Sequence, residues 1–389
     1  MAYKGEKFAR TIHGLEGNTP LERAYYVCPD CDETIFPLDE KLALRPDSWS
    51  SGAARVMTRF GLRAPSFEHA AEGYRDATGG QVSGASVRRV TEGFGTQVRA
   101  RQAAEAERAA QVGPFEEFPQ ERWLPFEYPL RARGNVSSDG TMVLIREEGW
   151  KEVKVAAFSE VKMLPPQDPD RRSSQREGPA RERDVVRLYH HSYCAGLWEA
   201  DTFGRYQYVE GLRRGFDLLP HTSSVNDGAR WIARITDTNF PYTTQVIDWS
   251  HSVEHLWAVG HAVFGEATPE ATHWVQQRKA ELWEGHVEMV EAALHLLDLD
   301  VDDYPDVVQQ APGYFHDRQA AMRYADFRAA GYPIGSGTVE SAARNVVQPR
   351  MRRPGQGWAR ENADAMLAAL GEFHSGRLQS SWQHIYSTA

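Results

Sequence analysis

Residues 135–143 read Asn-Val-Ser-Ser-Asp-Gly-Thr-Met-Val and place a single carboxylate, Asp139, inside a run that is otherwise typical of a β-strand. Burying an unpaired carboxylate costs free energy, and the small neighbours of Asp139 do not offset that cost. A bound metal ion would pair with the carboxylate and remove this cost. Asp139 is therefore the first candidate for chemistry, and the alternative is a turn-forming Asp-Gly pair in a hairpin.

Two other acids share this setting. Asp227 stands in Ser-Val-Asn-Asp-Gly-Ala-Arg-Trp (224–231), and Glu340 stands in Ile-Gly-Ser-Gly-Thr-Val-Glu-Ser-Ala (334–342). Asp227 could instead cap a helix, and Glu340 could be a first-turn acid favoured by the helix dipole. Three carboxylates contributed by strand, strand and helix predict an oxygen-lined site for two divalent cations.

The apolar pattern around these acids predicts an α/β domain. Alternation indicates strands over 136–145, 150–161 and 185–193, of which the first two form a hairpin. A helix over 200–216, a strand ending at Asn226-Asp227-Gly228, a helix over 229–238 and a strand over 244–249 follow. With three antiparallel strands and a fourth parallel to the first, Asp139 and Asp227 would face one another. The region of about 252–332 is expected to be an all-helical insertion, before a closing helix over 360–373.

The chain is thus expected to have three parts. An N-terminal segment (1–50) precedes a helical region with a proline-containing linker (51–125), and a catalytic domain (126–389) follows. With 41% hydrophobic and 11% aromatic residues in 389, the composition supports a packed core. No apolar run approaches 18 residues and the N-terminus lacks a signal peptide, so a cytoplasmic protein without a membrane partner is expected. Three cysteines argue against a disulfide framework.

The net charge of -10 counts against nucleic-acid binding by the whole surface, so any DNA contact must be local. Helical patterns over 67–77 and 86–97, joined by a polar turn, predict a helix-turn-helix with Arg88 and Arg89 on its second helix. A second basic stretch contains no acid and five arginines: Arg344, Arg350, Arg352, Arg353 and Arg360. Simple helix packing and a solvated face are the alternatives for these two regions.

Cys28 and Cys31 form a Cys-x-x-Cys knuckle after a short strand at 25–27. Such a knuckle supplies two thiolates to a tetrahedral Zn²⁺, for which His13 is a conceivable further ligand. A second cysteine pair is absent, so an incomplete knuckle is the alternative. Farther along, His251 and His255 lie four residues apart on one helical face, which fits either a metal site or ordinary packing.

Several stretches, taken in order, resemble a known family. They are Cys-Pro-Asp-Cys (28–31), Ser-Asp-Gly-Thr-Met-Val (138–143), Gly-Trp-Lys-Glu-Val-Lys-Val (149–155), Asn-Asp-Gly-Ala-Arg-Trp (226–231), Asp-Trp-Ser-His-Ser-Val-Glu-His-Leu-Trp (248–257) and Pro-Ile-Gly-Ser-Gly-Thr-Val-Glu-Ser (333–341). Together they resemble the ISKra-type bacterial insertion-sequence transposases of the DDE class, over nearly the whole chain. Members commonly carry a further Cys-x-x-Cys before the first, and this sequence departs from that pattern.

The resemblance implies a ribonuclease-H-like mixed sheet flanked by helices, with a helical insertion, acting on DNA with two Mg²⁺ or Mn²⁺ ions. Matched motif to motif, Asp139, Asp227 and Glu340 take the places of the three catalytic acids. Residues 248–251 resemble the Asp/Cys-x-x-His signature of related Mutator-like transposases, which makes His251 a further candidate. The implied reaction is cleavage at transposon ends and strand transfer into target DNA, by a homo-oligomer assembled on DNA.

The sequence leaves two other functions open. A decayed transposase would bind DNA without cutting it. A phosphatase of the haloacid-dehalogenase kind is suggested by Ser-Ser-Asp-Gly-Thr, which is similar to an Asp-x-Asp-Gly-Thr nucleophile motif. Ser137 stands at the nucleophile position here, and a serine cannot form the aspartyl intermediate.

Overall fold

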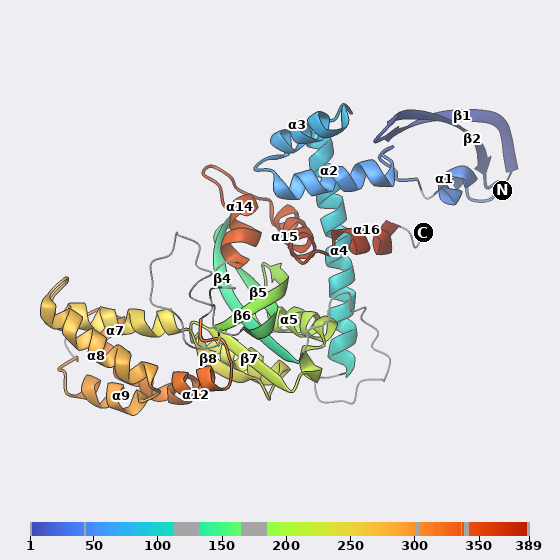
Figure 1. Cartoon of the computed structure of the whole chain (residues 1–389). Coiled ribbons are helices and arrows are strands. Elements are labelled where there is room, and N and C mark those ends of the chain that lie inside the picture. Colours follow the sequence, from blue (N-terminus) through green and yellow to red (C-terminus); the bar gives the residue numbers. More distant parts are fainter. Residues whose placement is uncertain are drawn as a thin grey trace, which may run out of the picture.

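A five-stranded mixed sheet in the order β6-β5-β4-β7-β8 lies at the centre of the molecule (Figure 1). The computed structural model describes residues 2–42, 44–112, 132–164, 185–299, 303–335, 337 and 342–386. Strands β4 (Arg133–Ile145), β5 (Gly149–Leu164) and β6 (Val185–Gly196) are antiparallel, whereas β7 (His221–Asn226) and β8 (Thr244–Ile247) run parallel to β4. This confirms the expected α/β class and the mixed strand order.

Helices cover both faces of the sheet because its strands bury apolar side chains on both. Val136 and Phe158 pack against α5 (Ala200–Arg214) and α6 (Arg230–Asn239). On the opposite face, Val143 and Val153 pack in a core shared with α15 (Arg360–His374). The expected helices 200–216, 229–238 and 360–373 are therefore present, within one or two residues.

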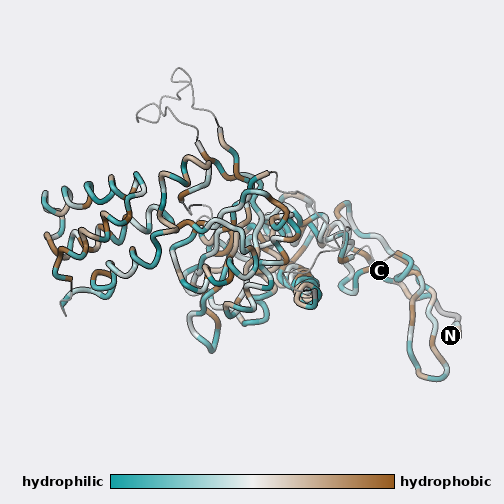
Figure 2. The backbone as a smooth tube through the Cα atoms, turned by 90° about the horizontal axis from the view of Figure 1, so that it is seen from below, coloured by the Kyte–Doolittle hydropathy of each residue, from teal (hydrophilic) through white to brown (hydrophobic). Residues whose placement is uncertain are grey.

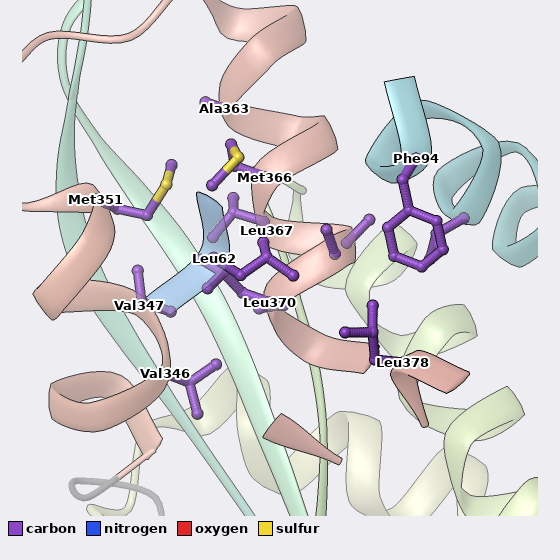
Figure 3. Close-up of a cluster of buried hydrophobic side chains, with 14 of the residues drawn as sticks. Leu62, Phe94, Val346, Val347, Met351, Ala363, Met366, Leu367, Leu370 and Leu378 are labelled. Carbon is purple, nitrogen blue, oxygen red and sulfur yellow. The ribbon is translucent and has the colours of Figure 1, made fainter. Parts of the chain in front are cut away.

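Three helices before the sheet belong to the same core. α2 (Ser51–Arg63) begins at the cap Ser50, and α3 (Phe67–Thr78) begins at the cap Ser66. α4 (Gly84–Val112) runs for 29 residues alongside α15, and a Cβ on Gly95 would lie 2.1 Å from the carbonyl oxygen of Ala365, so only glycine permits this approach. Figure 3 shows Leu62 and Phe94 meeting residues of α14 (Gln348–Met351), α15 and α16 (Leu378–Tyr386) in one cluster.

Buried charges also tie α4 to the sheet domain. They are three arginines and three glutamates from α4, α5, α15 and the start of α16: Arg101, Arg213, Arg377, Glu105, Glu210 and Glu372. Burial would raise the pKa of Glu372, but Arg377, Arg213 and Arg101 outweigh it and hold the pKa well below its usual range. The helical region is therefore fixed to the domain that follows it.

The helical insertion leaves the sheet after β8 and forms a second core, which it shares with Val225, Val246 and Ile247 of the sheet. Its elements are α7 (Trp249–Phe264), α8 (Pro269–Trp283), α9 (Val287–His295), α10 (Asp306–Gln309), α11 (Ala311–Asp317), η3 (Gln319–Ala321) and α12 (Tyr324–Ala329). Leu256, Val275, Leu282 and Phe315 are buried at its centre. The chain then returns through the π-helical segment η4 (Ala343–Val347) and α14 (Gln348–Met351). The described residues between β8 and η4 contain helices and no strand, as expected for this region.

An N-terminal β-ribbon, which the sequence did not predict beyond a short strand at 25–27, projects from the other end of the molecule. β1 (Ala2–Gly14) pairs with β2 (Gly17–Val27), and β2 pairs with β3 (Thr34–Ile35) before the short helix α1 (Pro37–Lys41). The turn end of the ribbon joins the body through a bridge between His13 and Trp49. In Figures 1 and 2 the ribbon and the insertion lie at opposite ends.

Residues 113–131, where the proline-containing linker was expected to end, lie outside the described residues, as do residues 165–184. The closing helix α15 is followed by α16 (Leu378–Tyr386), whose Trp382 stacks on Phe94 of α4. None of the described helices has both the length and the apolar character needed to cross a lipid bilayer.

Candidate functional site

The sheet brings Asp139 and Asp227 to corresponding positions on neighbouring parallel strands. Asn135 pairs with Ser223 and Val136 with Ser224, so the register continues to Ser138 beside Asn226. There the backbone N–H of Ser138 donates to Oδ1 of Asn226 at 2.6 Å. Asp139 follows Ser138 within β4, and Asp227 is the first residue after β7. The backbone thus carries the two residues to corresponding positions along neighbouring parallel strands.

A third aspartate extends the same row. β8 pairs with β7 up to Ile247 opposite Asn226, and the N–H of Asp248 donates to the carbonyl oxygen of Asn226 at 2.7 Å. Asp248 is buried, and its Oδ1 accepts the N–H of His251 at 2.8 Å, which caps α7. Asp248 belongs to a motif noted in the sequence, but no role was predicted for it. Its place between a strand and a helix is the signal that could have identified it as a helix cap.

A buried polar network holds the strands below these acids. Oγ of Ser223 donates to Oδ1 of Asn135 at 2.8 Å, and Nδ2 of Asn226 donates to Oγ of Ser224 at 2.7 Å. From α5, Nε2 of Gln207 donates to Oγ of Ser138 at 2.9 Å. Because satisfied buried hydrogen bonds rigidify their surroundings, the strand ends that carry the acids have a fixed register.

A residue of the helical insertion holds the loop that carries Asp227 in place. Oδ1 of Asp227 accepts the N–H of Ala229 at 2.9 Å, while Gly228 adopts a φ of +90°. Nε and Nη2 of Arg318 donate to the carbonyl oxygen of Gly228 at 3.3 and 3.2 Å. The guanidinium of Arg318 also lies 4.5 Å from the ring centre of Tyr314. Sequence reasoning missed both insertion residues, since nothing local in the sequence links positions about ninety residues apart.

His251 and His255 continue this cluster on α7, with ring centres 5.0 Å apart. His251 is half-buried and its Nδ1 lies 3.5 Å from Oε2 of Glu254. The ring of His255 stacks on Tyr314 at 3.8 Å, and burial, with His251 and Arg318 nearby, lowers its pKa to about 4. His255 is thus neutral at pH 7, with its ring packed against Tyr314.

Glu340 lies outside the described residues. The residues that flank it are placed. The N–H of Trp249 donates to the carbonyl oxygen of Ile334 at 2.8 Å, next to Asp248. On the other side, Nε2 of Gln348 donates to Oγ1 of Thr141 at 3.1 Å, two residues from Asp139. No group of three or more acidic, histidine or cysteine side chains suited to a metal occurs among the residues described.

The second basic stretch divides into buried and exposed arginines. Arg350 is buried, donates to the carbonyl oxygen of Gly61 at 2.9 Å and stacks on Phe67 at 4.2 Å. Burial lowers its pKa to about 10, with Arg353 contributing. The expectation that Arg350 contacts DNA is therefore corrected, because its guanidinium faces α2 and α3 instead of solvent.

The other four arginines of this stretch are exposed. The guanidinium of Arg352 lies 5.6 Å from the ring centre of Trp150, and Nε of Arg353 donates to the carbonyl oxygen of Pro349 at 2.9 Å. Arg360 binds both carboxylate oxygens of Glu148, at 2.7 and 2.6 Å. Arg344, Arg352 and Arg353 therefore remain candidates for contacts with DNA phosphates, whereas Arg360 is already paired with Glu148.

The helix-turn-helix expectation fits α3 and α4, which are joined by a turn that begins at Gly79 with φ +69°. Arg88 and Arg89 are both exposed near the N-terminus of α4, where a second helix of this motif makes its contacts. Nε of Arg88 lies 3.9 Å from Glu92, a loose pair on the same helix.

Cys28 and Cys31 lie in the loop after β2, at the projecting end of the ribbon. The N–H of Cys28 donates to the carbonyl oxygen of Glu33 at 2.8 Å, and the N–H of Asp32 donates back to the carbonyl oxygen of Cys28 at 3.0 Å. His13 is at the other end of β1, where its Nδ1 lies 2.7 Å from Oδ1 of Asn18. The fold therefore places His13 away from the cysteines and rules it out as their shared ligand.

A cavity of about 270 Å³ lies beside the acid row, between α6, β8 and η3. Ala233, Val246 and Ile247 give it mainly apolar walls, and Gly228 and Arg318 form part of its rim. Its position next to the residue after Asp227 makes it part of the surroundings of the candidate site.

Comparison of the chain with protein-family models and with curated proteins gives no match.

Proposed function

We propose that this protein cleaves and joins DNA strands as a DDE-type transposase, with Asp139, Asp227 and Glu340 as the acids that hold divalent cations. The observation that carries the proposal is the placement of Asp139 and Asp227 directly after paired residues of two neighbouring parallel strands. Two carboxylates at adjacent strand ends repel one another, and a shared divalent cation relieves that repulsion. The donor set fits Mg²⁺ or Mn²⁺, which prefer carboxylate oxygens.

Within this proposal each acid has a distinct task. Asp139, on the strand between β5 and β7, would contribute to both cations, while Asp227 and Glu340 would each serve one. When bound, the two ions supply an activated water or 3′-hydroxyl and stabilise the leaving oxygen. Asp248 fixes the start of α7 and thereby positions His251 near the same edge of the sheet.

The flanks of Glu340 support its inclusion. Residue 334 contacts the backbone next to Asp248, and residue 348 contacts β4 two positions beyond Asp139. The short connection between these two anchors carries Glu340 in the sequence. Exposed Arg88 and Arg89 on α4, with Arg344, Arg352 and Arg353 near α14, offer phosphate contacts for a DNA substrate.

Two alternatives can be separated from this proposal. In a haloacid-dehalogenase-type phosphatase the position of Ser137 would be the nucleophile, but Ser137 is fully buried and its Oγ accepts a hydrogen bond from Asn135. A DNA-binding protein without cleavage activity keeps the arginines and does not need the acids.

Nicking of supercoiled plasmid by the purified full chain tests the proposal. We expect relaxation that requires Mg²⁺ or Mn²⁺ and disappears in Asp139→Asn, Asp227→Asn and Glu340→Gln, each of which keeps side-chain shape but loses charge. Asp217→Asn is the matched control, since Asp217 precedes β7 at its opposite end. DNA binding that survives in all variants without nicking in the wild type would instead support the binding protein.

A further inference from the structure

Strands β4 and β5 continue past the acid row as a two-stranded hairpin. β6 ends opposite Lys154 of β5, and the parallel pairs of β4 with β7 end at Val136. From Gly140 onward β4 pairs with β5, as far as Ile145 opposite Gly149. The hairpin therefore extends beyond the edge of the sheet at which the two aspartates lie.

One face of this hairpin is packed against the body. Val143 and Val153 are fully buried in the core shared with α15. The segment before α15 braces the end of β4, because the N–H of Trp358 donates to the carbonyl oxygen of Leu144 at 3.0 Å. The N–H of Arg146 donates in turn to the carbonyl oxygen of Trp358 at 2.8 Å. The hairpin is therefore held in a fixed position relative to the acids.

The opposite face of the hairpin is open to solvent. Alternate residues of a strand share a face, so Met142 and Trp150 lie together on the side away from the packed core. Met142 is 40% exposed and Trp150 is 54% exposed. On this face Lys154 is buried, with its ammonium 5.3 Å from the ring centre of Trp231 of α6, but the next residue, Glu152, is exposed. The open face thus begins where the cover from α6 ends.

Arginines surround Trp150 on this open face. Arg146 and Arg353 are exposed and donate to the backbone carbonyl oxygens of residues 357 and 349. The guanidinium of Arg352 lies 5.6 Å from the ring centre of Trp150. These arginines come from the end of β4 and from the segment after α14, which lies beside β4 (Figure 1). An arginine next to an aromatic ring can bind a phosphate while a base stacks on the ring.

The acids of the hairpin do not cancel this positive charge. Glu148 pairs with Arg360 at 2.6 Å, and Glu152 pairs with Lys154. Glu147, in the turn, forms no ion pair with the residues that the structure describes. Three arginines against one unpaired acid leave the open face positively charged, which favours an anionic partner.

We infer that Trp150 stacks against an unpaired base of a DNA strand, while Arg146, Arg352 and Arg353 bind the phosphates beside it. Stacking on an aromatic ring inside a basic surface binds single strands without regard to sequence. Trp150 lies opposite the fifth residue after Asp139 on β4, which is about 17 Å or the rise of about five stacked nucleotides. The inference rests on the proposed function, because the strand it describes is the one that the acids would cleave.

Binding by the full chain without divalent cations tests the inference separately from cleavage. The probes are a labelled oligothymidine of about 20 nucleotides and a duplex of the same length. Trp150→Ala should lower affinity for the single strand about tenfold and affinity for the duplex less than about twofold, and Trp150→Phe should restore most of the loss. Tyr242→Ala is the matched control, since Tyr242 is 96% exposed and precedes β8 at the end of the sheet away from the acids.

A spectroscopic readout separates stacking from a structural effect of the substitution. With 2-aminopurine in place of several thymines, binding to the wild type should quench the fluorescence of the base analogue, because the analogue stacks on the indole ring. The Trp150→Ala variant, at concentrations that saturate the strand, should lose this quenching. Its urea unfolding should match that of the wild type, since the ring is mainly exposed.

Several results would overturn the inference. They are no binding of the single strand by the wild type, equal affinity in Trp150→Ala, and an equal loss for strand and duplex. An unchanged affinity together with an altered oligomeric state in light scattering would assign the open face to a protein contact instead. A wild type that binds strands through Trp150 but never nicks plasmid would refute the proposed cleavage and leave this inference standing.

Discussion

The backbone N–H of Ser138 donates to Oδ1 of Asn226 across 2.6 Å, so an asparagine side chain aligns β4 with β7 one residue before Asp139 and Asp227. Nδ2 of Asn226 donates a second hydrogen bond, to Oγ of Ser224. Replacing this side chain removes both bonds and takes away the acceptor of the buried N–H of Ser138, while Oγ of Ser224 keeps Oγ1 of Thr236 at 3.4 Å. The bond therefore links the stability of the sheet to the geometry of the candidate site.

We expect Asn226→Ala to lower the free energy of unfolding by about 1–3 kcal/mol, the usual cost of stranding buried hydrogen-bonding groups. Metal-dependent nicking should fall further than this loss explains, because the acids lose their alignment. Asn239→Ala is the comparison, since Asn239 makes two similar bonds to Gly204 and Gln207 in the adjoining helix. Equal activity losses in both variants, at matched folded fractions, would contradict a special role for the Ser138 bond.

Arg318→Met should weaken cation binding at the candidate site while changing the free energy of unfolding by only about 1 kcal/mol. The variant keeps most of the apolar stem but removes the two hydrogen bonds to Gly228 that hold the loop of Asp227. A Mg²⁺ titration of nicking should show about a tenfold higher half-saturating concentration. Arg323→Met removes an exposed pair with Asp326 and should leave the titration unchanged.

His255 should make unfolding pH-dependent. The unfolded chain binds a proton on this residue near its ordinary pKa of about 6.5, whereas the folded chain does so only near about 4. The unfolded state therefore binds more protons in that window, and stability falls as pH decreases from about 6.5 to 4. His255→Phe retains stacking on Tyr314 and should remove on the order of 1–2 kcal/mol of this fall in urea unfolding. His261→Phe, on the same helix, should not.

The arginines near α14 should separate into two classes. Arg350→Met should lower the free energy of unfolding by about 1–3 kcal/mol, because it removes the bond to Gly61 and the stacking on Phe67. Arg352→Ala with Arg353→Ala should leave unfolding unchanged within about 0.5 kcal/mol. The pair should weaken DNA binding and reduce the slope of log K against log salt by about 1–2. An unchanged slope would assign both residues to a solvated face.

The sheet was predictable because its strands follow simple alternation around Asp139 and Asp227. Their small polar neighbours are partners in the buried network, so the same residues that stood out in the sequence also organise the register. The pairing of β4 with β7 then followed from the number and direction of the strands between them. What could be predicted of the candidate site is thus the part that the sheet itself builds.

The rest depended on contacts that a sequence does not reveal. The ribbon escaped prediction because β2 has no fully buried residue and lacks the alternation that a buried face imposes. Arg350 donates to the carbonyl oxygen of Gly61, which lies 289 residues earlier in the chain. Nothing in its charged side chain or in the basic stretch around it indicated that Arg350 would be buried. Arg318 and Tyr314 meet the loop of Asp227 only because the insertion folds back onto the sheet.

The length of α4 has a mechanical consequence. At about 1.5 Å per residue, its 29 residues extend about 43 Å as one rod. The close approach at Gly95 and the buried charges around Glu105 clamp the rod to the sheet domain. Arg88 and Arg89 therefore lie at a fixed distance from Asp139. A DNA duplex bound by these arginines would reach the acids at a fixed distance from the place where the arginines hold it.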